Sequence, residues 1–199
     1  MTTVVDLLRH GEPLGGHIYR GQLDHALTEK GWQQMREAVA EHKPWQQIVT
    51  SPLSRCADFA NELAQRLDIP LQSQADFMEI AFGDWEGQSA QQLEIENKAA
   101  FYAFYDDPVN NTPPKAESLL AFEQRVSLAW SELLKQYQDK HVLVVGHAGM
   151  MRMIISHILQ MPKDAMYRIH IPNAGISRIS VSGQGARAYP QLLFHAGTL

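Results

Sequence analysis

Short apolar runs alternate with amphipathic stripes along the first third of the chain. Residues 4–8 form an apolar run typical of a buried strand, with one polar member, Asp6. Thr28 is a good N-cap, and apolar residues at helical spacing after it predict a helix over residues 29–41. A short strand at 47–50 then leads into a helix that continues to about residue 67. The order strand, helix, strand, helix predicts an α/β fold with a parallel sheet.

The rest of the chain extends this pattern after an interruption. The segment 88–107 is polar and aromatic, and the sequence "NNTPPKAES" that follows has the composition of a loop. A helical stripe begins at Ser118, and "HVLVVGH" is the clearest strand in the chain. Another helix, over about 150–159, and two β segments, near 176–181 and 189–194, complete the set.

We therefore expect a three-layer α/β sandwich, with a mostly parallel central sheet flanked by helices. No repeat, low-complexity tract or linker interrupts the sequence, so we expect residues 1–199 to form a single domain. The segment of about residues 86–117 is expected to be a helical, cap-like insertion over the active-site end of the sheet.

Composition narrows the possible partners. The chain has 199 residues, of which 45% are hydrophobic and 20% charged, which is typical of an ordinary globular protein. Its net charge of −5 gives a nucleic-acid partner no overall attraction. The single cysteine, Cys56, excludes an intrachain disulfide and suits a reducing compartment. We expect a cytoplasmic protein, monomeric or homodimeric, that binds neither nucleic acid nor membranes.

Two predicted strands end in a histidine flanked by glycine. "LLRHG" ends at His10, and "LVVGHAG" ends at His147. Ligands of parallel sheets bind at the carboxyl ends of strands, so both histidines are expected at the same edge. Arg9 and Arg55 also lie where strands give way to loops. One such histidine is more often structural, but two at one edge favour a site.

This combination of residues suits phosphoryl transfer. An imidazole can attack phosphorus when one nitrogen is free and the other is held by a carbonyl. His10 would be the nucleophile, while the forks of Arg9 and Arg55, with His147, would bind the phosphoryl oxygens. Glu79, in "FMEIAFGDWEG", has apolar neighbours that favour a protonated carboxyl, as a general acid requires.

Other chemistries fit less well. Cys56 lies in a predicted helix and is followed six positions later by Glu62 rather than arginine, so it is interpreted as a buried small residue. A zinc site of His10, His147 and Glu79 has enough ligands, but adjacent arginines would repel the cation. We therefore expect no metal and no cofactor. Glu86 remains an alternative acid to Glu79.

Four motifs in order carry a family resemblance. "LLRHGEP", "SPLSR", "FMEIAFGDWEG" and "VVGHAG" together resemble the histidine phosphatase superfamily, also called phosphoglycerate mutase-like, over residues 4 to about 160. The resemblance implies that His10 becomes phosphorylated, that Arg9, Arg55 and His147 form the phosphate pocket, and that Glu79 donates the proton. The sequence departs from the family pattern after "RHGE", where Pro13 stands in place of the usual Ser or Thr.

The patterns "EIAFGDWEG" and "PPKAES…FEQRV" most resemble the α-ribazole phosphatases of that superfamily. This resemblance implies hydrolysis of α-ribazole 5′-phosphate in assembly of the cobalamin nucleotide loop. The alternatives are a broad-specificity or sugar-phosphate phosphatase and, with less support, a phosphoglycerate mutase or a non-catalytic phosphate-binding protein. The chain is short for a mutase and lacks the Glu-x-x-Tyr motif at Glu79.

Further residues are candidates for substrate binding. They are Gly21, Gln22, Ser51 and Ala148. The first two could instead be turn residues, and Ser51 could cap the helix that follows it. Trp85 and the aromatic residues of "FYAFY" could form a wall for an aromatic substrate, or could be core residues.

Overall fold

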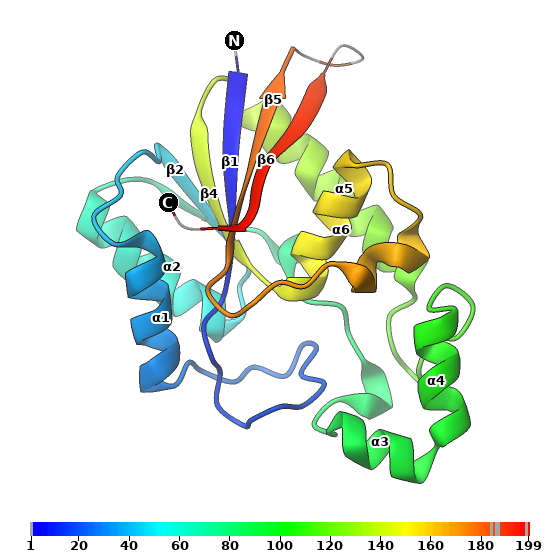
Figure 1. Ribbon diagram of the computed structural model, residues 1–199. Helices are drawn as coiled ribbons and strands as arrows, with labels where there is room; N and C mark the ends of the chain where they lie inside the picture. Colours follow the sequence, from blue (N-terminus) through cyan, green and yellow to red (C-terminus); the bar gives the residue numbers. More distant parts are fainter. Residues whose placement is uncertain (1, 184, 186–187, 198) are drawn as a thin grey trace.

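A six-stranded sheet forms the centre of the computed structural model, which describes residues 2–183, 185, 188–197 and 199 (Figure 1). The strand order is β3-β2-β4-β1-β5-β6. The strands are β1 (Thr2–Arg9), β2 (Gln47–Thr50), β3 (Leu71–Ser73), β4 (His141–Gly146), β5 (Ile176–Ser182) and β6 (Tyr189–Gly197). The first four pair in parallel, while β5 is antiparallel to β1 and β6. The predicted mostly parallel sheet is confirmed.

Helices cover both faces of this sheet, as predicted for three layers (Figure 1). One face packs against α1 (Glu29–Val39) and α2 (Ser54–Leu67), and the other against α5 (Leu119–Gln136) and α6 (Ala148–Ile158). Side chains alternate along a strand, so Val142 and Val144 of β4 enter the α5–α6 core while Leu143 and Val145 enter the α1–α2 core. Among the described residues, no helix is both long and apolar enough to cross a membrane.

The helix starts follow the capping signals in part. Thr28 caps α1, its side chain accepting from the N–H of Gly31, as predicted. Ser51, however, does not cap α2, which begins at Ser54. Asp24 does so from a distant loop, because its carboxylate accepts from both the N–H and the hydroxyl of Ser54 at 2.7 Å. This contact ties the loop after β1 to the start of α2.

The segment 86–117 contains two short helices, α3 (Ala90–Glu96) and α4 (Lys98–Asp106), which lie on the side of the sheet where β1 ends (Figure 1). Three short 3-10 helices, at Ala75–Phe77, Gly83–Trp85 and Lys163–Arg168, had no signal in the sequence pattern. Trp85 and Phe104 are buried in a separate aromatic cluster with Tyr19, Phe82, Phe101 and Tyr167. These rings form the local core of α3 and α4, so the core interpretation of Trp85 and Phe104 is confirmed.

Asp6 is a fully buried carboxylate in the middle of β1. It accepts hydrogen bonds from Trp45 Nε1 (2.8 Å), His141 Nε2 (2.9 Å) and both Nε and Nη2 of Arg178 (2.7 and 2.9 Å). Burial alone would raise the pKa of Asp6, but the hydrogen bonds from His141, Arg178 and Trp45 lower it overall. The ionised carboxylate thus joins β1 to β4, β5 and the segment before β2.

Replacing Asp6 by Asn is expected to destabilise the fold by about 3 kcal/mol, because Arg178 loses the carboxylate that compensates it in a partly buried position. Urea unfolding at pH 7 measures this free energy. Asp58→Asn, at an exposed position of α2, is the matched control and is expected to have little effect. Equal stabilities of the two variants would contradict the role assigned to Asp6.

Candidate active site

The two strand-terminal histidines meet at the carboxyl edge of the sheet. β1 and β4 are neighbouring parallel strands in a register that pairs Arg9 with Gly146, so His10 and His147 each follow the last pair. Their ring centroids are 5.3 Å apart, and both side chains are buried. The expected convergence of the two histidines is therefore present in the structure.

The His10 imidazole is held in one tautomer. Its Nδ1 lies 2.7 Å from the carbonyl oxygen of Gly11, which can only accept, so Nδ1 carries the proton and Nε2 keeps its lone pair. Burial, and then the charges of Arg9 and Arg55, lower the pKa of His10 well below its usual value. The ring is thus neutral at pH 7, with a nucleophilic Nε2.

His147 is fixed by a neighbouring strand end. Its Nε2 lies 2.7 Å from the hydroxyl of Ser51, the residue that follows β2. Burial lowers the pKa of His147 well below its usual value, so this ring is neutral as well. Cys56 is fully buried beside it, with Sγ 3.6 Å from Nε2, and burial raises the pKa of its thiol. Cys56 is therefore a buried neutral residue, as interpreted from the sequence.

Arg9 and Arg55 bring two positive charges to the site. Neither forms an ion pair within the described part of the chain. Carbonyl oxygens hold them instead: Ile171 accepts from Arg9 Nη1 at 2.6 Å, and Leu23 and Gly21 accept from Arg55 at 2.7 Å. Each keeps a buried Nε without an acceptor among the described residues. Burial lowers the pKa of Arg9 to about 10, so it stays charged at pH 7. This arrangement favours an anion.

Glu79 lies against the first turn of α6, the helix that begins directly after His147. Its Oε1 accepts from the N–H of Ile80 at 3.1 Å, and its Oε2 accepts from the N–H of Gly149 at 3.0 Å. Glu86 has a different environment, because its Oε1 accepts from the backbone N–H groups of Gln22 and Phe82, each at 3.0 Å. Of the two acids, Glu79 is the one hydrogen-bonded to the first turn of the helix that follows His147.

The candidate substrate-binding residues mainly contact other candidate residues of the site. Gly21 has a φ of +51°, its carbonyl holds Arg55, and a Cβ there would lie 2.0 Å from Glu86 Oε1. The side-chain amide of Gln22 donates to the carbonyl of Glu79 at 3.2 Å. Ser51 bonds His147, as described above. Ala148 is the first residue of α6, where helix N–H groups have no acceptor within the helix.

A cleft of about 590 Å³ opens beside Arg9. Its lining residues are Arg9, Glu12, Pro13, Leu14, Gly15, Gly16, His17, Ile18, Arg20, Thr28, His170, Pro172 and Asn173. None of Arg20, His17 and His170 was among the candidate residues named from the sequence. The guanidinium of Arg20 donates to the carbonyls of Leu14 (2.9 Å) and Gly16 (2.8 Å), which fixes the loop in which Pro13 departs from the family pattern.

Metal coordination is not supported by the arrangement of the side chains that the structure describes. Within the described residues, no group of three or more histidine, cysteine, aspartate and glutamate side chains is arranged to hold a metal ion.

A buried neutral histidine beside two arginines that form no ion pair among the described residues, at the carboxyl edge of a parallel sheet, has the chemistry that phosphoryl transfer requires. The family model of the histidine phosphatase superfamily (branch 1) matches residues 5–189, and the chain belongs to this superfamily. It is therefore a phosphatase of the hydrolase class, and its substrate is a small phosphorylated molecule.

Individual relatives differ in their named substrates. The chain is 28% identical over 179 residues to an adenosylcobalamin/alpha-ribazole phosphatase of Salmonella typhimurium, covering 88% of this chain and 89% of the relative. It is 29% identical over 169 residues to a putative phosphoserine phosphatase 2 of Hydrogenobacter thermophilus, covering 84% and 83%. A solved structure of a putative alpha-ribazole-5′-P phosphatase from Escherichia coli K-12 superposes with a TM-score of 0.85 at 25% identity, covering 97% of this chain and 95% of that one.

Gly149→Ala is expected to lower kcat/KM for an alkyl phosphate at least about tenfold, since proton transfer depends on a correctly placed acid. The new Cβ would lie 2.2 Å from Glu79 Oε1 and displace the carboxylate. Alanine also favours the helix relative to glycine, so the thermal midpoint is not expected to fall. Steady-state kinetics and a thermal melt measure both effects. Wild-type kcat/KM would contradict the placement of Glu79.

The two buried neutral histidines predict weaker folding in acid. Their pKa is lowered in the folded state, so below pH 6.5 the unfolded chain binds protons that the folded chain does not. The free energy of unfolding should therefore fall by about 1 kcal/mol per histidine between pH 6.5 and 5.5. Urea unfolding in phosphate-free buffer measures this loss, and His10→Gln should remove about half of it. An unchanged pH dependence in that variant would exclude His10 as a source.

Proposed function

We propose that this chain hydrolyses phosphomonoesters through a phosphohistidine at His10. The lone pair of His10 Nε2 attacks phosphorus, and the bond from phosphorus to the ester oxygen breaks. The carboxyl of Glu79 gives its proton to the leaving oxygen, which departs as an alcohol. Arg9, Arg55 and His147 bind the phosphoryl oxygens as charge moves onto them. Gly21, Gln22, Ser51 and Ala148 complete this site, the first three by holding these groups in position.

The second step returns the enzyme to its starting state. The Glu79 carboxylate takes a proton from a water molecule, whose oxygen attacks phosphorus while the bond to Nε2 breaks. Inorganic phosphate leaves, His10 is again neutral, and Glu79 again carries a proton. The arginines supply the positive charge that this chemistry needs, so we expect full activity in excess chelator and propose no metal and no cofactor.

One observation carries this proposal. The hydrogen bond from His10 Nδ1 to Gly11 leaves Nε2 as a free base beside two arginines that lack carboxylate partners. A non-catalytic phosphate-binding protein would need the arginines but not a neutral histidine with a defined tautomer, so that alternative has less support. A mutase is also disfavoured, for the reasons given by the sequence.

For the substrate, we propose α-ribazole 5′-phosphate, in assembly of the cobalamin nucleotide loop. The similarity to the Salmonella relative supports this choice, as does a cleft roomy enough for a nucleoside-sized group. One observation favours the alternative, a broad-specificity or sugar-phosphate phosphatase. Among the described residues, no phenylalanine, tyrosine or tryptophan lines the cleft, because Trp85 and Phe104 are buried in their own aromatic cluster. We further propose that residues 1–199 act as one domain, with about 86–117 as its cap, in a cytoplasmic monomer or homodimer.

Release of inorganic phosphate from α-ribazole 5′-phosphate and from a panel of sugar, nucleotide and glycolytic phosphates separates the two substrate proposals. We expect kcat/KM for α-ribazole 5′-phosphate to exceed the others by about a hundredfold, or about 2.7 kcal/mol in the transition state. A flat profile would favour the broad-specificity alternative. His10→Ala is expected to abolish hydrolysis of every member while phosphate binding survives. Turnover at the wild-type rate in His10→Ala would refute the phosphohistidine intermediate.

A further inference from the structure

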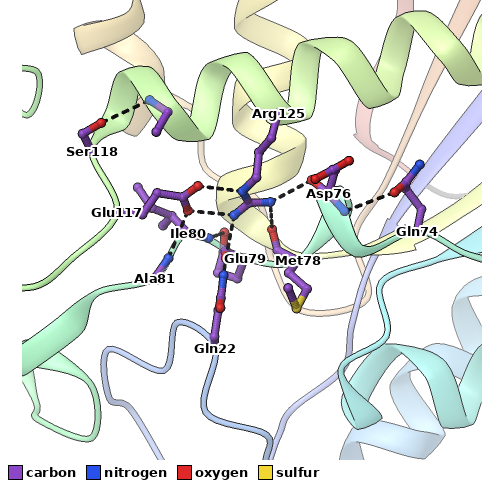
Figure 2. Close-up of polar contacts among 11 residues, drawn as sticks. Gln22, Gln74, Asp76, Met78, Glu79, Ile80, Ala81, Glu117, Ser118 and Arg125 are labelled. Atoms are coloured by element: carbon purple, nitrogen blue, oxygen red, sulfur yellow. Dashed lines mark hydrogen bonds and ion pairs between the residues drawn. The ribbon is translucent and has the colours of Figure 1, made fainter.

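Arg125, on the face of α5 toward Glu79, uses its whole guanidinium to hold the segment that carries this acid. Nη1 donates to the carbonyls of Asp76 at 2.7 Å and Met78 at 2.9 Å, and Nη2 donates to the carbonyl of Glu79 at 3.0 Å. Figure 2 shows the side chain descending from its helix with these three carbonyls gathered around it. Three backbone carbonyls within four residues are thus bound by one planar group.

Glu117 fixes this guanidinium from the other side. Its Oε1 accepts from Arg125 Nε at 2.6 Å, and its Oε2 accepts from Nη2 at 2.8 Å (Figure 2). The same Oε2 accepts from the N–H of Ala81 at 3.3 Å, and the N–H of Glu117 donates to the carbonyl of Ala81 at 2.9 Å. The pair therefore holds the backbone on both sides of Glu79. Both side chains are largely buried, with 18% and 16% exposed.

Apart from the burial of Ile80 and the hydrogen bond from the N–H of Phe82 to Glu86, the segment is held mainly by side chains from other elements. Residues 78–82 belong to no helix or strand, so no regular backbone ladder positions them. The Gln22 amide adds one more donor to the carbonyl of Glu79. Among the described residues, the Glu79 carboxylate itself accepts from the N–H groups of Ile80 and Gly149. A displacement of this loop by about 1 Å is enough to slow proton transfer by up to about a hundredfold.

We propose that Arg125, oriented by Glu117, is a positioning residue for the proton donor Glu79. This inference rests on the proposed function, because it assumes that Glu79 transfers the proton. A lysine cannot replace Arg125, since a single ammonium cannot reach three carbonyls and a carboxylate with the geometry of a planar fork. Neither Arg125 nor Glu117 touches the substrate in this proposal.

Dependence on the leaving group tests the role. Nitrophenolate leaves phosphorus without needing a proton, whereas the alkoxide of an alkyl phosphate needs one. Arg125→Lys is expected to lower kcat/KM for an alkyl phosphate by about 10- to 100-fold, with a much smaller loss for the nitrophenyl ester. Glu79→Gln should show the same selectivity. The Kd for inorganic phosphate should stay near wild type in Arg125→Lys.

Two further variants make the test specific. Glu117→Gln keeps the side-chain shape but removes the charge, so it should show the same selectivity at smaller magnitude even if Arg125→Lys folds poorly. Arg36→Lys is the matched control, because Arg36 makes a bidentate pair with Glu62 on the exposed face of α1 and α2. It should leave both substrates unaffected.

The outcomes separate the inference from the function beneath it. Equal losses on both substrates in Arg125→Lys and Glu117→Gln, or no loss in either, would overturn the positioning role while Glu79→Gln remains selective. If Glu79→Gln is itself not selective, the proton-donor assignment fails, and the role of Arg125 fails with it.

Discussion

The hydrogen bond between His10 Nδ1 and the carbonyl of Gly11 is the interaction on which the chemistry of this site depends. It is a contact between adjacent residues, yet it determines which nitrogen carries the proton. Burial then keeps the ring uncharged, and two arginines without carboxylate partners oppose any added proton. The same features that would make His10 a nucleophile toward phosphorus leave positive charge in the pocket, so the pocket favours an anion.

The two halves of the site are held in different ways. His10, His147 and Ser51 follow three neighbouring strands, so the hydrogen-bonded register of β1, β4 and β2 sets their positions. Glu79 lies on an irregular segment, which is held by side chains from other elements. The sheet edge thus carries the two histidines and Ser51, and a loop held by other elements carries Glu79, the proposed acid. Such a division allows the cap and the loops to vary between relatives while the phosphoryl chemistry is kept.

Local patterns predicted the parts of this structure that depend on local physics. The apolar runs at β1 and β4 predicted the buried strands, and parallel pairing then brought His10 and His147 together without further information. Arg55 was singled out because it lies just after a predicted strand, and the motif resemblance assigned it to the same site. The aromatic segment near Phe104 was ambiguous, because the composition of a core and that of an apolar wall are alike.

Contacts between residues far apart in the sequence could not be predicted from these local patterns. Asp24 caps a helix thirty positions later in the sequence, and Arg125 binds carbonyls more than forty positions earlier. Neither contact has a periodicity or spacing to reveal it. Arg20 and His170 likewise reach the cleft only through the folds of separate loops. Single-sequence reasoning therefore named the candidate reacting groups and some of the residues that contact them, Gly21, Gln22 and Ser51, but missed Asp24, Arg20 and Arg125.

The most direct test of the account is to identify the phosphorylated atom. Enzyme mixed with an excess of substrate and quenched within milliseconds should carry an acid-labile, base-stable phosphoryl group, which peptide mapping assigns to His10. NMR of the denatured protein should then place phosphorus on Nε2, because Nδ1 is committed to Gly11. Phosphorus on Nδ1, on another residue, or on no residue during turnover would contradict the central claim.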